Sequence, residues 1–236
     1  MKQKSRTEYS VMNTTVAFLA QTLAIFMGFF TRVVFTRTLS EGYVGINGLF
    51  TDILNILSLS ELGVGTAITY ALYAPIARRD IKKQQILMRM FRNFYRITAG
   101  FVVLAGLCLI PFLDILMKDR PDVNHLIIIY LLYLLNSVVS YLLIYKKTLV
   151  DAHQMNYITV MYHNGFLVLQ DILQIMVLFL TQNFILFLVI AVSCTIIGNI
   201  CMSRKADRLF PYLKESCKEQ LPQEERHDIL RNVKAM

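Results

Sequence analysis

The stretch FILFLVIAVSCTIIGNICM, residues 184–202, runs for 19 residues without a charged side chain. An α-helix of about 20 residues crosses the roughly 30 Å hydrocarbon core of a bilayer. The stretch therefore predicts a membrane-spanning helix. The tight turn TQN at 181–183 joins it to another apolar run, residues 157–180, which predicts a second span.

Further apolar runs occupy most of the chain, with short polar or charged segments between them. The predicted spans are residues 11–31, 44–72, 97–117, 125–145, 157–180 and 184–202. Of the 236 residues, 56% are hydrophobic and 17% are charged, which is too apolar for an ordinary soluble domain. We therefore expect an all-α membrane protein with about six transmembrane helices in residues 1–202 and a basic tail at 203–236.

Positive charge is concentrated in alternate connecting segments. Twenty of the 24 lysines and arginines fall in the N-terminus, in residues 73–96, in residues 146–147 and in the tail. This bias matches the positive-inside rule and predicts that both termini are cytoplasmic. Nucleic-acid binding is not expected, because it needs the charge gathered on one folded face or tail. Within residues 74–96, apolar side chains recur at helical spacing among the cations, which predicts an interfacial helix on the inner leaflet.

Polar side chains form stripes along three of the predicted spans. At 100° per residue, one sector of the fifth span collects Asn156, Thr159, His163, Asn164, Gln170, Asp171, Gln174 and Thr181. The second span aligns Asn47, Thr51, Asn55, Ser58 and Glu61, with Asp52 to one side, and the first span aligns Thr14, Gln21, Gly28 and Arg32. A shared hydrated cavity accounts for three such stripes, and helix-packing hydrogen bonds are the alternative reading of each.

Charged residues at membrane depth admit several interpretations. The carboxylates Asp52, Glu61 and Asp171 could pair with an arginine, bind a proton or cation, or lie near a headgroup. Arg32 could extend towards the interface or contact an anion through its guanidinium group. His163 is either a hydrogen-bonding residue of the helix packing or part of a proton relay.

No motif of an enzyme, a metal site or a cofactor site is present. The sequence lacks HExxH, GxSxG, GxxxxGK[ST] and paired cysteine motifs, and its polar segments are too short for a catalytic domain. We expect neither catalysis nor a cofactor, apart from coupling to a proton or a sodium ion.

Three quoted stretches carry a resemblance to a known family: FFTRVVFTRTLSEGYVGINGLF, LSLSELGVGTAITYALYAPIARRD and YRITAGFVVLAGLCLIPFLDILM. They resemble the N-terminal half of the bacterial polysaccharide or O-antigen flippases, within the multidrug, oligosaccharidyl-lipid and polysaccharide exporter superfamily. The most specific parts are Arg32 and Arg37 ahead of LSEGYVGINGL, then ELGVG from Glu61, and the basic segment after LYAPIA. The later spans match mainly by pattern.

The resemblance implies a transporter that moves an undecaprenyl-pyrophosphate-linked oligosaccharide across the bacterial cytoplasmic membrane. Such proteins alternate access between two six-helix lobes around a central, often cationic cavity. By this analogy the candidate substrate-binding residues are Arg32, Arg37, Gln21, Asn47, Asn55, Asn164, Gln170 and Gln174. The candidate ion-coupling residues are Asp52, Glu61, Asp171 and His163.

The sequence departs from the family in length. Family members carry about twelve to fourteen spans, whereas this chain supplies one lobe, and its end, DILRNVKAM, resembles the segment that joins two lobes. We expect a truncated or half-length copy that lacks the C-terminal lobe, with self-association of two copies as the alternative. Membrane lipids, a lipid-linked glycan, a glycan polymerase and glycosyltransferases are the partners that the resemblance implies.

Three alternative functions stay open. A drug or cation antiporter of the same superfamily would have a less anion-oriented cavity. A non-transporting scaffold would dock glycan-assembly enzymes on its basic segments, and an inactive fragment would do neither.

Overall fold

The structure, a computed structural model, describes residues 6–58, 64–117 and 123–214. Within these ranges the chain is all-α and contains no strand. The main helices are α1 (Arg6–Thr38), α2 (Glu41–Ser58), α3 (Val64–Ala77), α4 (Ile81–Leu109), α6 (Leu126–Leu142), the short α7 (Ile144–Ala152), α8 (Asn156–Thr181) and α9 (Phe184–Leu209). Shorter turns are η2 (Ile110–Phe112), α5 (Leu113–Leu116) and η3 (Pro211–Lys214). Glu61 lies outside the described residues.

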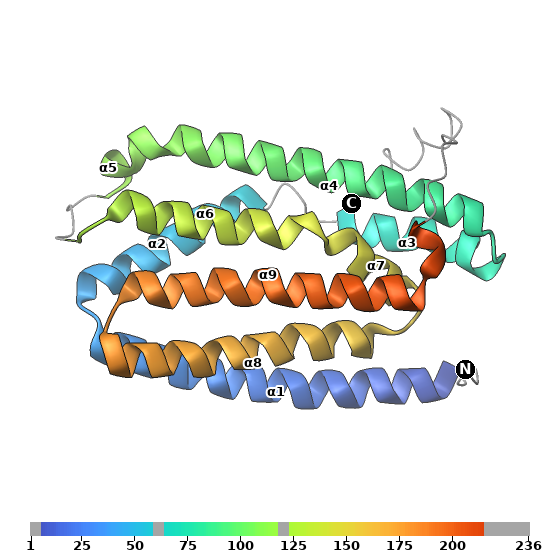
Figure 1. Cartoon of the computed structure of the whole chain (residues 1–236), viewed down its shortest axis with the longest axis horizontal. Helices are drawn as coiled ribbons and strands as arrows, with labels where there is room; N and C mark the ends of the chain where they lie inside the picture. Colours follow the sequence, from blue (N-terminus) through green and yellow to red (C-terminus); the bar gives the residue numbers. More distant parts are fainter. Residues whose placement is uncertain (1–5, 59–63, 118–122, 215–236) are drawn as a thin grey trace.

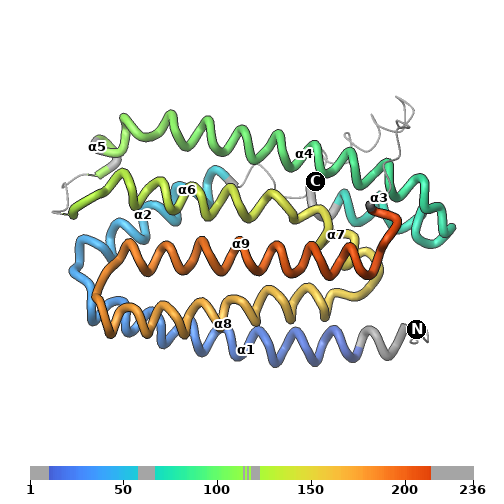
Figure 2. Tube along the Cα trace, in the orientation of Figure 1, coloured from blue at the N-terminus to red at the C-terminus, as the bar shows by residue number. Residues whose placement is uncertain are grey.

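Five of the helices lie side by side in one row, as Figure 1 shows. The order across the row is α4, α6, α9, α8 and α1, and each neighbouring pair is in contact. Helix α2 packs on α6 and α4, and α3 packs on α7 and α4, so both lie behind the row in this view (Figures 1 and 2). Helix α1 forms one edge of the row, and its main neighbour is α8.

The helices are long and apolar enough for a protein that spans a membrane several times. Four helical segments qualify among the described residues: Val11–Thr38, Ile81–Phe112, Asn156–Thr181 and Phe184–Leu209. A fifth span is obtained if α6 and α7, which meet at a bend of 41°, cross together. Together these segments make the chain a multi-pass, all-α membrane protein, as the sequence predicts.

The predicted second span, 44–72, is not one continuous helix in the described residues. It is divided between α2 and α3, and residues 59–63 between them are outside the description. Neither helix reaches the roughly 20 residues that a perpendicular crossing needs. The described part of the chain therefore contains four or five candidate spans, compared with the predicted number of about six.

The prediction of a separate interfacial helix at 74–96 is wrong. Helix α4 begins at Ile81, after a cap in which the Asp80 carboxylate accepts the backbone N–H of Lys83 at 3.0 Å, and continues unbroken to Leu109. Its apolar residues Leu87 and Phe91 are buried against α3 and α7, so they do not lie on a leaflet. Most of the basic segment is thus the first half of one continuous helix, whose second half is apolar.

Two clusters of buried side chains hold the bundle, one towards each end. One cluster joins α1, α2, α4, α6, α8 and α9 around Phe35, Phe50 and Tyr130. The other joins α3, α4, α7, α8 and α9 around Leu72, Phe91 and Leu149, at the end that holds the N-terminus of α1. The chain's outward-facing large apolar side chains suit a lipid environment, because lipid tails are as apolar as the core.

Among the described residues, the segments richest in lysine and arginine lie at one end of the bundle. That end, on the right in Figure 1, collects the start of α1, the turn between α3 and α4, helix α7 and the end of α9. The opposite end holds the turn between α1 and α2 and the turn between α8 and α9, where Gln182 is left-handed and Asn183 caps α9. The bundle is therefore electrostatically polarised along its axis.

Candidate functional site: a polar groove and a polar cavity beside α8

The polar stripe of α8 serves two different neighbours. Asn164 and Asp171 meet α1, whereas Gln174 meets the backbone of α9. Asn164 and Gln174 are buried, and Asp171 is half-buried. Because α8 lies between α1 and α9 in the row, one stripe of about 140° reaches both. Many residues of the stripe therefore form hydrogen bonds between helices, which is one of the two interpretations that the sequence allows.

Three hydrogen-bonded contacts join α1 to α8 along their length. At the basic end, Asn13 accepts the backbone N–H of Tyr157 at 2.8 Å and donates to the Gln154 carbonyl at 2.9 Å. In the middle, Asn164 donates to the Gln21 amide oxygen at 3.3 Å.

The third contact lies towards the opposite end of the bundle. The buried Thr31 hydroxyl donates to the Asp171 carboxylate at 3.0 Å and also contacts the Met27 carbonyl at 3.0 Å. The predicted ion-coupling residue Asp171 thus has a neutral hydroxyl as its partner on α1. A carboxylate held this way keeps one contact whether or not it is protonated.

An open groove runs along α1 beside the first two of these contacts. Its volume is about 680 Å³, and its lining combines amides and hydroxyls with the apolar side chains of Ala17, Phe18, Ile25 and Val160. The polar residues of the lining are Asn13, Thr14, Gln21, Thr22 and Asn156. Asn13 and Gln21 already form hydrogen bonds within the protein, and water or a polar ligand would bond to the donor and acceptor capacity that remains. The groove is thus the described surface best suited to a hydroxyl-rich substrate.

The polar face of α2 is only partly used in packing. Asn47 is half-buried, and its amide oxygen accepts the hydroxyl of Tyr133 on α6. Thr51, Asp52 and Asn55 are exposed, so they do not line the closed packing between α2 and α6. The structure therefore separates Asn47, a packing residue, from the exposed candidates further along α2.

The two candidate arginines are exposed at the end of α1 away from the basic end. The Arg32 guanidinium lies over the ring of Phe35, with its carbon 5.5 Å from the ring centroid. Such a cation–π contact orients the guanidinium while leaving its N–H donors accessible. Arg37 is exposed one and a half turns further on. Both side chains can meet an anion at that end of the membrane.

Two other predicted residues belong to a separate cavity between α6, α7, α8 and α9. The cavity has a volume of about 250 Å³, and His163 and Gln170 line it. Its polar lining also includes Lys147, Thr159 and Asn199. No sequence pattern singles out Lys147 or Asn199, because they come together only through the packing of α7 and α9.

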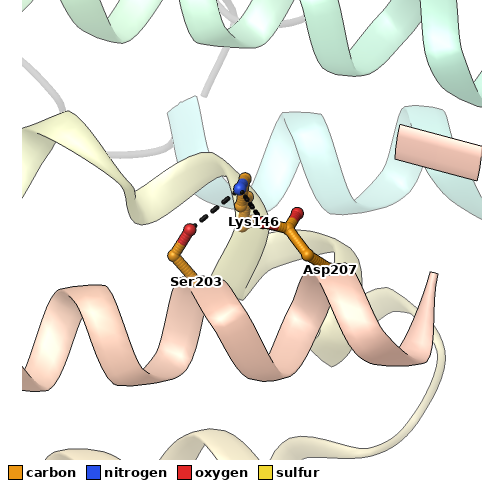
Figure 3. Close-up of polar contacts among 3 residues, drawn as sticks. All are labelled: Lys146, Ser203 and Asp207. Atoms are coloured by element: carbon orange, nitrogen blue, oxygen red, sulfur yellow. Dashed lines mark hydrogen bonds and ion pairs between the residues drawn. The ribbon is translucent and has the colours of Figure 1, made fainter. Parts of the chain in front are cut away.

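Helix α7 is tied to α9 by a half-buried ion pair. Lys146 donates to the Asp207 carboxylate at 2.8 Å and to the Ser203 hydroxyl at 2.8 Å, as Figure 3 shows. The side chains of Lys146 and Asp207 are 15% and 24% exposed. The pair fixes the short helix beside the end of α9.

Polar contacts at the basic end join three further segments. Gln84 of α4 is buried, donates to the Pro75 carbonyl of α3 at 3.2 Å and accepts the Tyr212 hydroxyl at 2.6 Å. Burial raises the pKa of Tyr212 to about 12. Nearby, the His153 ring lies 4.3 Å from that of Phe210, and burial lowers the pKa of His153. These contacts close the basic end of the bundle.

Among the described residues, no group of three His, Cys, Asp or Glu side chains is placed to hold a metal ion. Together, the fold and these two hollows define a polytopic α-helical membrane protein with polar surfaces between its helices. The chain matches no protein-family model, no curated protein and no solved structure.

Proposed function

We propose that this protein is a flippase for lipid-linked oligosaccharides and acts as one lobe of a two-lobe exporter. The observation that carries the proposal is the open groove of about 680 Å³ along α1 and α8, where amides and hydroxyls stand among apolar side chains within long apolar helices. Sugar hydroxyls are both donors and acceptors, and they match such a lining.

Different residues of α1 would bind different parts of the substrate. Gln21, already held by Asn164, presents its amide to the groove and would contact the glycan. Arg32 and Arg37, at the far end of the same helix, would bind the pyrophosphate through charge-assisted hydrogen bonds. The substrate would therefore lie along α1.

An ion-coupling step would use a carboxylate beside this path. Asp171 is the best placed of the predicted residues, because its contact with Thr31 lies directly between α1 and α8. Protonation or sodium binding at Asp171 would alter this contact and with it the packing of the edge helix. Asp52, exposed on α2, is the second candidate.

A second lobe would cover the polar surfaces that α1 and α2 leave exposed. Helix α1 is an edge of the row, and only 11% of its apolar 18-residue window is buried within this chain. A partner lobe, or a second copy of this chain, would face α1 and complete the cavity. The single basic end supports a bacterial cytoplasmic-membrane protein with both termini in the cytoplasm.

The test is a flipping assay in liposomes that contain the purified protein and a pyrophosphate-linked oligosaccharide lipid. Exposure of the glycan to an impermeant oxidant in the outer compartment reports its movement. We expect Arg32→Ala to slow flipping at least tenfold, because it removes a charge-assisted contact with the phosphate. The matched control is Arg204→Ala, an exposed arginine at the opposite end of the bundle, which should leave the rate unchanged.

Each other outcome identifies a different function. Full flipping by Arg32→Ala would refute its role in binding the pyrophosphate. Uptake of an organic cation without glycan movement would indicate the antiporter. If neither compound is transported, the remaining alternatives are the non-transporting scaffold and the inactive fragment.

A further inference from the structure

We infer that the cavity between α6, α7, α8 and α9 binds the phosphate headgroup of an anionic phospholipid, whose acyl chain lies along α8. This site is distinct from the groove on α1 and would hold a resident lipid, so it does not depend on the proposed transport function. The cavity, an adjoining apolar hollow and a buried hydroxyl carry the inference.

The cavity presents a cationic group together with hydrogen-bonding groups. Lys147 lines it from α7 and is close enough to His163 on α8 to interact with it electrostatically. Lys146, its neighbour in sequence, is already committed to Asp207, whereas Lys147 faces the hollow. A half-buried lysine beside a polar cavity attracts a phosphate oxygen.

A buried hydroxyl lies on the same cavity. Thr159 is only 2% exposed and forms no hydrogen bond of normal geometry, although the half-buried Asp151 carboxylate is close enough to interact with its hydroxyl. A phosphate oxygen in the cavity would accept this hydroxyl. Asp151 also lies near Lys147 but does not line the cavity, so it is the carboxylate with which a bound phosphate would compete.

The shape beside the cavity favours an amphiphile over a free phosphate. A hollow of about 200 Å³ on α8 is lined by Met161, Tyr162, Gly165, Phe166 and Leu169. It shares Tyr162 and Phe166 with the cavity, so the two adjoin each other. The hollow is apolar along most of its lining and open at Gly165, where an added Cβ would meet nothing within 4 Å. An acyl chain fits there while its headgroup reaches Lys147.

The depth also suits a headgroup. Lys147 lies five residues from the end of α7, and His163 lies seven residues into α8, about 8 Å and 10 Å along their axes. Helix α8 has 26 residues, about 39 Å, which exceeds the hydrocarbon thickness by several ångströms. The Lys147 side of the cavity therefore lies towards the basic end, whereas Gln170, about 21 Å along α8, lines its deeper side.

The experiment titrates the purified chain in neutral detergent with dioleoyl phosphatidylglycerol and, separately, with glycerol 3-phosphate, and reads bound molecules by native mass spectrometry. We expect one saturable phosphatidylglycerol site. Lys147→Gln should weaken it at least tenfold and Lys147→Arg should restore it. The matched control Lys82→Gln, an exposed lysine at the same end, should stay within twofold of the wild type.

A second pair of variants separates the lipid from a soluble phosphate. Gly165→Leu fills the apolar hollow. It should weaken the binding of phosphatidylglycerol at least tenfold without changing the affinity for glycerol 3-phosphate. Gly100→Leu, another open helical glycine, should change neither. Equal effects of Lys147→Gln and Lys82→Gln would overturn the site. Dependence on Lys147 with no effect of Gly165→Leu would overturn the lipid assignment in favour of a soluble phosphate.

Discussion

Breaking the contact between Lys146 and Asp207 should measurably destabilise the bundle, because α7 is a helix of only 9 residues. Two unit charges 2.8 Å apart interact by about 6 kcal/mol at an effective dielectric constant of 20, before their desolvation is subtracted. Exposed pairs retain about 0–1 kcal/mol, and loss of one partner of a fully buried pair costs about 3–5 kcal/mol. With exposures of 15% and 24%, we expect a cost of about 2 kcal/mol for Lys146→Met.

A double-mutant cycle isolates the pair from its surroundings. Lys146→Met, Asp207→Asn and the double variant are unfolded reversibly by sodium dodecyl sulfate in mixed micelles, with helix content as the signal. We expect a coupling free energy of about 1–2 kcal/mol. Ser203→Ala, which removes a second acceptor of Lys146, should cost less, about 1 kcal/mol. Strictly additive single variants would refute the role of the ion pair in holding α7 to α9.

Two further predictions concern packing and pH. Gly106→Ala places a methyl group against the Leu134 side chain and should destabilise the protein by about 1–3 kcal/mol. Gly100→Ala, at an open helical position, should stabilise the protein slightly. Equal unfolding curves for the two variants would contradict this prediction. Because burial beside Phe210 lowers the pKa of His153 in the folded state, the unfolded chain binds its proton first, so stability should fall as pH drops below about 6.5. His153→Phe should reduce the dependence of the unfolding free energy on pH between pH 7 and 5.5. An unchanged dependence would assign the effect to another titrating group.

The turn between the last two long helices could be predicted from the sequence because its determinants are local. The polar turn TQN follows a long apolar run, and the structure ends α8 at Thr181 and begins α9 at Phe184. Helix α9 nevertheless continues to Leu209, seven residues beyond the predicted span. Its charged last turns stay helical because Asp207 and Ser203 face Lys146 of α7. That partner lies about 60 residues away in sequence, so no local pattern reveals it.

The candidate site was predictable only in part, for a related reason. Helical periodicity correctly grouped Asn164, Asp171 and Gln174 on one stripe, but it does not say which neighbour each will meet. The structure gives the first two to α1 and the third to α9. Lys147 was missed because it resembles a residue of a short connecting loop, whereas it belongs to a helix that faces a cavity.

The central claim is that the groove along α1 is a hydrated path, and thiol accessibility tests it most directly. Gln21→Cys, in the groove, is compared with Leu23→Cys, at similar depth on another side of α1, in a background without native cysteines. The reagent is a membrane-impermeant maleimide applied to proteoliposomes. We predict that the cysteine at position 21 reacts at least tenfold faster than the one at position 23. Equal, slow reaction at both positions would contradict the claim and leave the polar face of α1 as helix packing alone.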